Sequence, residues 1–284
     1  MVSDPYAIIG RDNFRPLPIR IGRLEISQGG PPVFMAGPCA VESRQQLLKI
    51  AEQVKEAGAD VLRGGAFKPR TAPGGFEGLG EEGLTYLAEA RDKLQIPIVT
   101  EILSEEHVKL FEKYPIDIYQ IGARNMQNFA LLKAVARTRK PVLLKRHFGA
   151  GISEWLSAAA HIVAAGNDKV ILCERGILPV GKNHKEFERY SLHLSAIPIA
   201  KQETRLPIIA DPSHGTGRCE LVEPMARAAI AAGADGLLVD VHYNPAEALV
   251  DGHNAIDVER LKRLIAACKG IWSLNPRSAQ WPSS

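Results

Sequence analysis

The sequence contains only four cysteines in 284 residues, and none of them belongs to a Cys-x-x-Cys pair. It also lacks an apolar stretch of signal-peptide length near its start and any run of about 18 apolar residues that would span a membrane. These absences predict a cytoplasmic protein with reduced thiols and no membrane partner. The four cysteines are Cys39, Cys173, Cys219 and Cys268.

A strong excess of charge of one sign is also missing. The formal net charge is +3, which is too small to indicate a nucleic-acid partner by itself. Hydrophobic residues make up 45% and charged residues 24%, as in an ordinary soluble globular protein. No linker or low-complexity segment divides the chain, and no dinucleotide fingerprint follows a predicted strand.

From residue 33 onward, short apolar runs alternate with segments that carry apolar residues at i, i+3 and i+4. Several runs, such as PVLLK, are continuously apolar, as parallel strands buried on both faces are. Eight such units favour an α/β fold of the (β/α)8 TIM-barrel type over a doubly wound open sheet. The predicted strands are 33–38, 61–66, 96–101, 116–122, 141–146, 169–175, 207–211 and 236–242, and the helices include 44–57, 81–94, 104–114, 128–137, 153–165 and 220–232.

The two ends of the chain differ from the repeating part. Residues 1–32 form an N-terminal extension in which 19–27 alternate between apolar and polar residues, a pattern that predicts a strand or hairpin over the bottom of the barrel. Residues 33–270 form the catalytic barrel. Residues 271–284 are a polar, proline-containing tail that we expect to be loosely held.

Cations gather where the predicted strands end. The carboxyl ends of barrel strands meet at one mouth, so their side chains converge. Like charges repel, and so many cations persist best where an anion neutralises them. The forked guanidinium and compact ammonium groups suit phosphate and carboxylate oxygens. The mouth is therefore predicted to bind one or two phosphorylated ligands through Arg63, Lys68, Arg70, Arg124, Lys145, Arg146 and Arg175.

A second group at the strand ends contains Cys39, His214, Asp240 and Asp251. A thiolate, an imidazole and two carboxylates suit a divalent transition ion. Taken singly, Cys39 is equally well a small buried hydrophobe and His214 a hydrogen-bonded loop histidine. The residues alone leave both interpretations open.

The motifs AGPCAVES, VLRGGAFKPRT, QIGARNMQNFALLK, VLLKR, ILCERGI, DPSHGTGR and VDVH…DG occur in one order along the chain. Together they resemble 3-deoxy-arabino-heptulosonate 7-phosphate (DAHP) synthase, class I, of the compact short-chain type, over roughly residues 33–265. The sister enzyme, 3-deoxy-octulosonate 8-phosphate synthase, typically has a different motif where this chain has KPRT. KPRT therefore favours erythrose 4-phosphate as the acceptor.

The resemblance implies a metal-dependent condensation of phosphoenolpyruvate with erythrose 4-phosphate, which gives DAHP and phosphate as the first step of the shikimate pathway. It implies a divalent ion, with Mn²⁺ favoured over Fe²⁺, Co²⁺ or Zn²⁺, and a homo-oligomer (dimer or tetramer). The implied residues are Arg63, Lys68, Arg124, Lys145 and Arg175 for phosphoenolpyruvate, Arg70 and Thr71 with Lys68 and Pro69 nearby for the aldose phosphate, Cys39, His214, Asp240 and Asp251 for the metal, and Lys68, Lys145 and Glu101 for catalysis.

Some positions depart from the family pattern. Asp240 replaces the usual glutamate, Ala72 and 74–75 remove a hydroxyl donor, and HFGAG at 147–151 and the segment after ILCERGI, with His193, are rewritten. Because the substitutions cluster on the aldose side, the alternative is a specialised-pathway paralogue that uses another aldose or aldose phosphate. A catalytically silent barrel is disfavoured, since Lys68, Lys145 and the candidate metal ligands are retained.

Overall fold

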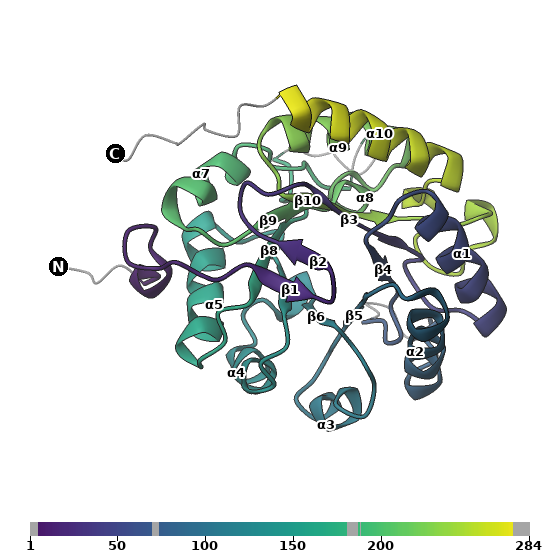
Figure 1. Cartoon of the computed structure of the whole chain (residues 1–284), viewed down its shortest axis with the longest axis horizontal. Helices are drawn as coiled ribbons and strands as arrows, with labels where there is room; N and C mark the ends of the chain where they lie inside the picture. Colours follow the sequence, from purple (N-terminus) through teal and green to yellow (C-terminus); the bar gives the residue numbers. More distant parts are fainter. Residues whose placement is uncertain (1–4, 70–73, 181–186, 188, 275–284) are drawn as a thin grey trace.

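The computed structural model describes residues 5–69, 74–180, 187 and 189–274. Eight parallel strands close into a barrel in the order β10-β3-β4-β5-β6-β7-β8-β9, with the helices around it (Figure 1). The predicted TIM barrel is confirmed, although each strand is shorter than its apolar run. The barrel strands are β3 (Val33–Gly37), β4 (Val61–Arg63), β5 (Ile98–Glu101), β6 (Ile118–Ile121), β7 (Val142–Lys145), β8 (Val170–Glu174), β9 (Ile208–Ala210) and β10 (Gly236–Asp240).

The helices follow the predicted segments closely, with one correction. Helix α3 covers only His107–Phe111, not 104–114, because both of its ends are closed by i→i+3 turns. The described helices are α1 (Arg44–Glu56), α2 (Glu81–Leu94), α3, α4 (Phe129–Arg137), α5 (Ile152–Ala164), α7 (Ala196–Glu203), α8 (Pro212–Thr216), α9 (Cys219–Ala231) and α10 (Val258–Leu274), with 3₁₀ turns at Ala7–Ile9, Ala123–Asn125, Pro245–Glu247 and Gly252–Asn254.

Successive strand residues are buried on opposite faces of the sheet. In β3, Val33 and Met35 belong to a cluster inside the barrel, whereas Phe34 and Ala36 belong to the larger core beneath the helices. Both faces of each strand are thus covered, which explains the continuous apolar runs. The charged side chains of the barrel strands lie at their carboxyl ends, as Arg63, Lys145 and Asp240 do, and the site is built there.

A hairpin covers the amino-terminal end of the barrel (Figure 1). Strands β1 (Ile19–Ile21) and β2 (Leu24–Ile26) pair antiparallel, which confirms the predicted N-terminal β extension. Ile19 and Ile26 are buried and join the cluster inside the barrel. The hairpin therefore closes the bottom of the barrel with two apolar side chains, opposite the mouth.

Truncation of a buried side chain in this hairpin is expected to destabilise the fold. Ile26→Ala removes a side chain that is 1% exposed and should lower the free energy of unfolding by about 2–5 kcal/mol. The matched control is Glu25→Ala, next to it on the same strand, which should change stability by about 0.5 kcal/mol or less. Urea unfolding measures both. A loss of unfolding free energy for Ile26→Ala as small as that of the control would contradict the role of the hairpin in closing the barrel.

The last helix packs beside α9 and extends to Leu274. It therefore passes residue 270, where the predicted barrel ends, and takes in the first four residues of the predicted tail. Its buried side chains are Leu261, Leu264, Ile265 and Cys268. The remainder of the predicted tail lies outside the described residues. No helix in the described ranges is both long and apolar enough to cross a bilayer.

Candidate active site

A pocket opens at the carboxyl ends of the barrel strands. It gathers residues that lie far apart in the sequence, as the strand-end pattern predicts. Gln120 and Arg189 also line it and were not in the predicted set. Arg70 and Thr71, predicted for the aldose phosphate, lie outside the described residues. The predicted residues that do line the pocket are Lys68, Pro69, Glu101, Arg124, Lys145, Arg175, His214 and Asp251.

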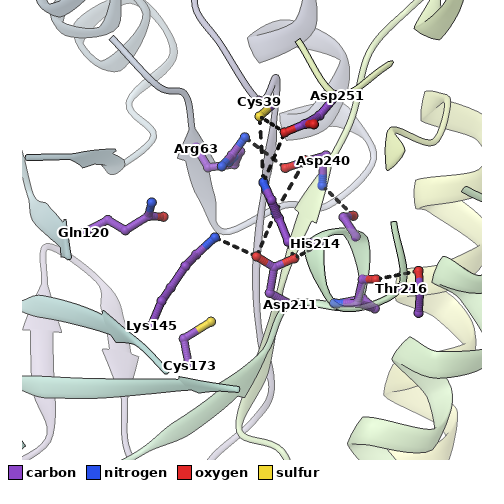
Figure 2. A network of polar contacts seen from close by, with 12 residues as sticks. Cys39, Arg63, Gln120, Lys145, Cys173, Asp211, His214, Thr216, Asp240 and Asp251 are labelled. Atoms are coloured by element: carbon purple, nitrogen blue, oxygen red, sulfur yellow. Dashed lines mark hydrogen bonds and ion pairs between the residues drawn. The ribbon is translucent and has the colours of Figure 1, made fainter. Parts of the chain in front are cut away.

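Three of the four predicted metal ligands lie together beside this pocket (Figure 2). The Sγ atom of Cys39 is 3.8 Å from Nε2 of His214 and 3.4 Å from Oδ2 of Asp251. The same Nε2 atom is 3.8 Å from Oδ2 of Asp251. Cys39 comes from the loop after β3, His214 from the short helix α8 after β9, and Asp251 from the segment after β10. Asp251 has a left-handed backbone (φ 53°), which aspartate tolerates better than most residues.

Asp240, the fourth predicted ligand, has a different setting. Its Oδ1 atom is 2.9 Å from Nη1 of Arg63, and its Oδ2 atom is 3.6 Å from Nδ1 of His214. Asp240 is therefore outside the Cys39–His214–Asp251 cluster and faces the opposite nitrogen of the imidazole. Both carboxylate oxygens of Asp240 are buried and have no hydrogen-bond partner among the described residues, so the ion pair with Arg63 is the main balance to its negative charge.

Asp211 is a site residue that the sequence analysis missed. It directly follows β9 and caps α8, where it accepts a hydrogen bond from the backbone N–H of His214 at 2.9 Å. Its Oδ2 atom is 2.9 Å from Nδ1 of His214 and accepts from Nζ of Lys145 at 2.6 Å. One buried carboxylate therefore orients both a candidate metal ligand and a candidate substrate ligand. The Asp-Pro step, an N-cap residue followed by proline at the first helical position, was the available signal.

The charges of this group are interdependent. Burial opposes the charge on His214, but the carboxylates of Asp211 and Asp240 outweigh it and raise the pKa of His214 to about 9. Burial likewise opposes ionisation of Asp211, yet His214 and Lys145 hold its pKa well below the ordinary value. With Asp211 on Nδ1, the Nε2 atom is directed at Cys39 and Asp251.

Lys68 approaches the same cluster from the loop after β4. Its Nζ atom lies 3.2 Å from Sγ of Cys39 and donates to the carbonyl oxygen of Cys39 at 3.0 Å. Burial disfavours the Cys39 thiolate, but Lys68 more than compensates together with His214 and Arg63, and the pKa of Cys39 is lowered. A Cβ at Gly65 would come within 2.7 Å of the Cys39 carbonyl oxygen and 2.8 Å of Lys68 Cδ, so glycine permits this approach.

The cluster fits a divalent transition ion. Two ligands about 2.2 Å from an ion at a tetrahedral angle lie about 3.6 Å apart, which matches the donor separations of 3.4–3.8 Å. Thiolate, imidazole and carboxylate are also a suitable donor set. A carboxylate on the far nitrogen of the histidine, here Asp211, is the usual outer support of such a ligand.

The opposite wall of the pocket carries the anion-binding groups. Lys145 and Arg175 are buried, and Nη1 of Arg175 has no hydrogen-bond partner among the described residues. Gln120 Nε2 donates to Oε2 of Glu101 at 3.2 Å, which fixes that carboxylate at the pocket edge. Arg146, expected at the mouth, instead lies behind this wall. Its guanidinium is engaged by Glu174, His193 and the Ala150 carbonyl.

Loss of the Asp240 carboxylate should leave Arg63 as a buried charge without its ion-pair partner. We expect Asp240→Asn to lower the free energy of unfolding of the metal-free protein by about 3–5 kcal/mol. Glu25→Gln, which removes the exposed partner of Arg20, is the control and should cost at most about 1 kcal/mol. Denaturant unfolding compares the two. Equal losses would show that the Arg63–Asp240 pair carries no structural weight.

A TIM barrel with a cationic pocket and an adjoining thiolate–imidazole–carboxylate cluster defines a barrel enzyme for phosphorylated substrates. Comparison with known proteins narrows the class. The model of the DAHP synthetase I family matches residues 16–273. The chain therefore belongs to the DAHP synthetase I family, which confirms the resemblance and the enzyme class predicted from the motifs.

Individual relatives agree with this assignment. The phospho-2-dehydro-3-deoxyheptonate aldolase of Thermotoga maritima is 47% identical over 95% of this chain and 78% of its own length. Its crystal structure superposes with a TM-score of 0.88 over 93% of this chain and 76% of that one. The 2-dehydro-3-deoxyphosphooctonate aldolase of Geobacter sulfurreducens is more distant, at 32% identity over 89% of this chain and 97% of that protein. Membership of the family supports the predicted condensation of phosphoenolpyruvate with an aldose phosphate.

Proposed function

We propose that the protein condenses phosphoenolpyruvate with erythrose 4-phosphate, giving DAHP and inorganic phosphate as the first step of the shikimate pathway, and depends on a divalent metal ion. The observation that carries the proposal is the junction of the cationic pocket with the Cys39–His214–Asp251 cluster. It places the cationic side chains that would bind the anionic substrates beside the residues that would hold a metal ion to activate the aldehyde.

The relatives favour a four-carbon acceptor. Phosphoenolpyruvate contributes three carbons, so a seven-carbon heptonate product requires a four-carbon aldose, and an eight-carbon octonate product requires a five-carbon aldose. The heptonate enzyme from Thermotoga maritima is 47% identical to this chain, whereas the octonate enzyme from Geobacter sulfurreducens is 32% identical. The KPRT motif points the same way.

Phosphoenolpyruvate carries a phosphate and a carboxylate and needs several cations. We assign it to a set of cations that are buried or line the pocket and that together would hold both groups. Arg70 and Thr71 are proposed for the phosphate of the aldose, with Pro69 and Lys68 at the boundary between the substrates. The proposed phosphoenolpyruvate ligands are Arg63, Lys68, Arg124, Lys145 and Arg175.

The chemistry begins with attack of C3 of phosphoenolpyruvate on the aldehyde carbon. A divalent ion held by Cys39, His214 and Asp251 would act as a Lewis acid toward the aldehyde. Lys68 is placed to give a proton to the alkoxide oxygen, and Glu101 to orient the water that adds to C2. The resulting phosphohemiketal breaks its C–O bond and releases phosphate. Fixing both substrates face to face supplies an advantage of about 7–11 kcal/mol at most.

Asp240 is proposed to support the centre from outside the three-ligand cluster. It neutralises Arg63 and faces Nδ1 of His214, so its shorter side chain leaves the cluster geometry to the other three residues. We keep Mn²⁺ as the favoured ion, with Fe²⁺, Co²⁺ and Zn²⁺ as alternatives that metal analysis of the purified protein would separate. A cytoplasmic location is proposed from the few, widely spaced cysteines, and a dimer or tetramer is proposed from the resemblance alone. Sedimentation tests the assembly.

Metal binding should release protons. A histidine ligand must be neutral, and the pKa of His214 in the metal-free protein is about 9, since Asp211 and Asp240 outweigh its burial. At pH 7.5 we therefore expect about one proton to leave His214 for each Mn²⁺ bound, and affinity to rise from pH 6.5 to 8.5. Titration calorimetry in buffers of different ionisation enthalpy counts the protons. Binding with no proton release at pH 7.5 would exclude His214 as a ligand.

The acceptor is tested by phosphate release with a panel of aldoses. With Mn²⁺ and phosphoenolpyruvate, erythrose 4-phosphate should give the highest kcat/KM, above five-carbon aldose phosphates and unphosphorylated erythrose. A higher value for another aldose would replace this proposal by the specialised-pathway alternative. If phosphoenolpyruvate did not bind in the presence of Mn²⁺, the catalytically silent barrel would be the better explanation.

A further inference from the structure

Tyr190 lies against two of the arginines that line the pocket. The guanidinium carbon of Arg175 is 4.2 Å from the centre of the Tyr190 ring, and that of Arg189 is 5.5 Å from it. Both arginines belong to the pocket wall, whereas Tyr190 does not line the pocket and is buried behind it. One aromatic ring therefore supports two cations from outside the substrate space.

Several contacts hold this ring in place. Phe148 stacks on Tyr190 with ring centres 5.3 Å apart and an interplanar angle of 24°. The backbone on either side is fixed, because Arg189 N–H donates to the Thr216 carbonyl at 2.9 Å and Ser191 exchanges two 3.0 Å hydrogen bonds with Ile177. A Cβ at Gly176 would come within 2.8 Å of Tyr190 Cβ, so the segment is packed tightly.

Arg175 needs such a support because it has no salt bridge within the described ranges. A ring covers the flat face of a guanidinium and leaves the N–H donors at its edge free for a phosphate or carboxylate. Arg146 shows the opposite arrangement. Its donors are used by Glu174, His193 and the Ala150 carbonyl, and it does not line the pocket.

We propose that Tyr190 is a positioning residue for phosphoenolpyruvate binding, which acts by stacking on Arg175 so that its N–H donors face the anion, and on Arg189, whose Nη1 also lies 3.5 Å from Oδ1 of Asp251. The inference rests on the proposed function for the identity of the anion. It gives a role to two segments that the sequence singles out as rewritten, HFGAG with Phe148 and the segment after ILCERGI with Tyr190. The ring acts through the arginines and touches no reacting atom.

The test measures phosphoenolpyruvate binding by calorimetry with Mn²⁺ present, together with kcat and KM. Tyr190→Leu keeps an apolar side chain but removes the aromatic face, and we expect its Kd and KM for phosphoenolpyruvate to rise about ten-fold while kcat changes less than three-fold. Tyr190→Phe keeps the ring and should stay within about two-fold of wild type. Tyr243→Leu is the matched control. Lys49 Nζ lies 4.0 Å from the centre of the Tyr243 ring, and neither residue lines the pocket.

The outcomes separate the inference from the proposed function. Wild-type protein that fails to bind phosphoenolpyruvate would overturn the proposed function. Wild-type binding with an unchanged Kd in Tyr190→Leu would overturn only the role of Tyr190. A Tyr190→Phe variant as weak as Tyr190→Leu would assign the effect to the hydroxyl and also overturn it. Circular dichroism and thermal unfolding of each variant establish that the compared proteins are folded.

Discussion

Removal of the divalent metal by a chelator is expected to lower the condensation rate by about 10³-fold or more, with recovery on addition of Mn²⁺. Lewis-acid activation of the aldehyde is worth several kcal/mol, and each 1.4 kcal/mol or so is about a factor of ten in rate. Phosphoenolpyruvate is a weak carbon nucleophile, so the remaining residues offer no equivalent activation. Residual turnover and metal content are measured on the same chelated sample.

Cys39→Ser tests the same centre from the protein side. The Sγ atom lies 3.8 Å from Nε2 of His214 and 3.4 Å from Oδ2 of Asp251, and it is the thiol of this cluster. We expect metal affinity to fall by about 100-fold or more and activity to fall with it. Cys219→Ser is the control, because Cys219 is partly exposed and hydrogen-bonds Glu220 instead. Full activity in chelated protein, or unchanged metal content in Cys39→Ser, would contradict a metal centre at this position.

The second large effect is expected for Lys68→Met. Burial opposes the charge on Lys68, but Cys39 and Glu101 offset it, and its pKa is raised above the ordinary value. Lys68 thus stays protonated at neutral pH and is able to give a proton to the alkoxide. Loss of a general acid typically costs about 10²–10⁴-fold in rate, so kcat should fall by that amount.

Lys109→Met is the matched control for Lys68→Met, because Lys109 is exposed on α3 away from the pocket. Its kcat should equal that of wild type. Lys68 is not itself a ligand, so Lys68→Met should still bind the metal, but more weakly, because Cys39 loses the cation that favours its thiolate; kcat is therefore measured at saturating Mn²⁺. A kcat within ten-fold of wild type would remove Lys68 from the proton-transfer role and leave it as a binding residue.

The barrel was predictable because the sequence pattern that produces it repeats along the chain. Apolar runs alternate with amphipathic segments, and the period of each is legible without tertiary information. The ends of the strands were less predictable, since the hydrogen-bonded pairing between strands stops before the apolar run does. In β4, for example, the strand stops at Arg63 although the small and apolar residues continue to Ala66.

The positions of the site residues along the chain were predictable, but the orientations of their side chains were less so. The strand-end rule places Cys39, His214, Asp240 and Asp251 at one mouth, but which oxygen faces which nitrogen depends on neighbours far away in sequence. Asp240 is paired to Gly37 across the barrel seam and its carboxylate meets Arg63 from the next strand along. No local pattern specifies that contact.

Asp211 and Arg146 show the same limit in opposite directions. Asp211 reads as the last residue of a strand, yet it orients His214 and Lys145 because α8 begins immediately after it. Arg146 reads as one more cation at the mouth, yet the Ala150 carbonyl and Glu174 hold it behind the pocket. Sequence position gives proximity to the site, whereas the hydrogen-bond partners decide the role.

The most direct test of the central proposal is a competition between acceptors. The purified protein with Mn²⁺ and phosphoenolpyruvate is given equal concentrations of erythrose 4-phosphate and a five-carbon aldose phosphate, and the products are identified by mass. We predict that the seven-carbon product predominates and that one phosphate is released for each phosphoenolpyruvate consumed. A predominant eight-carbon product, or phosphate release without a new carbon–carbon bond, would contradict the proposed function.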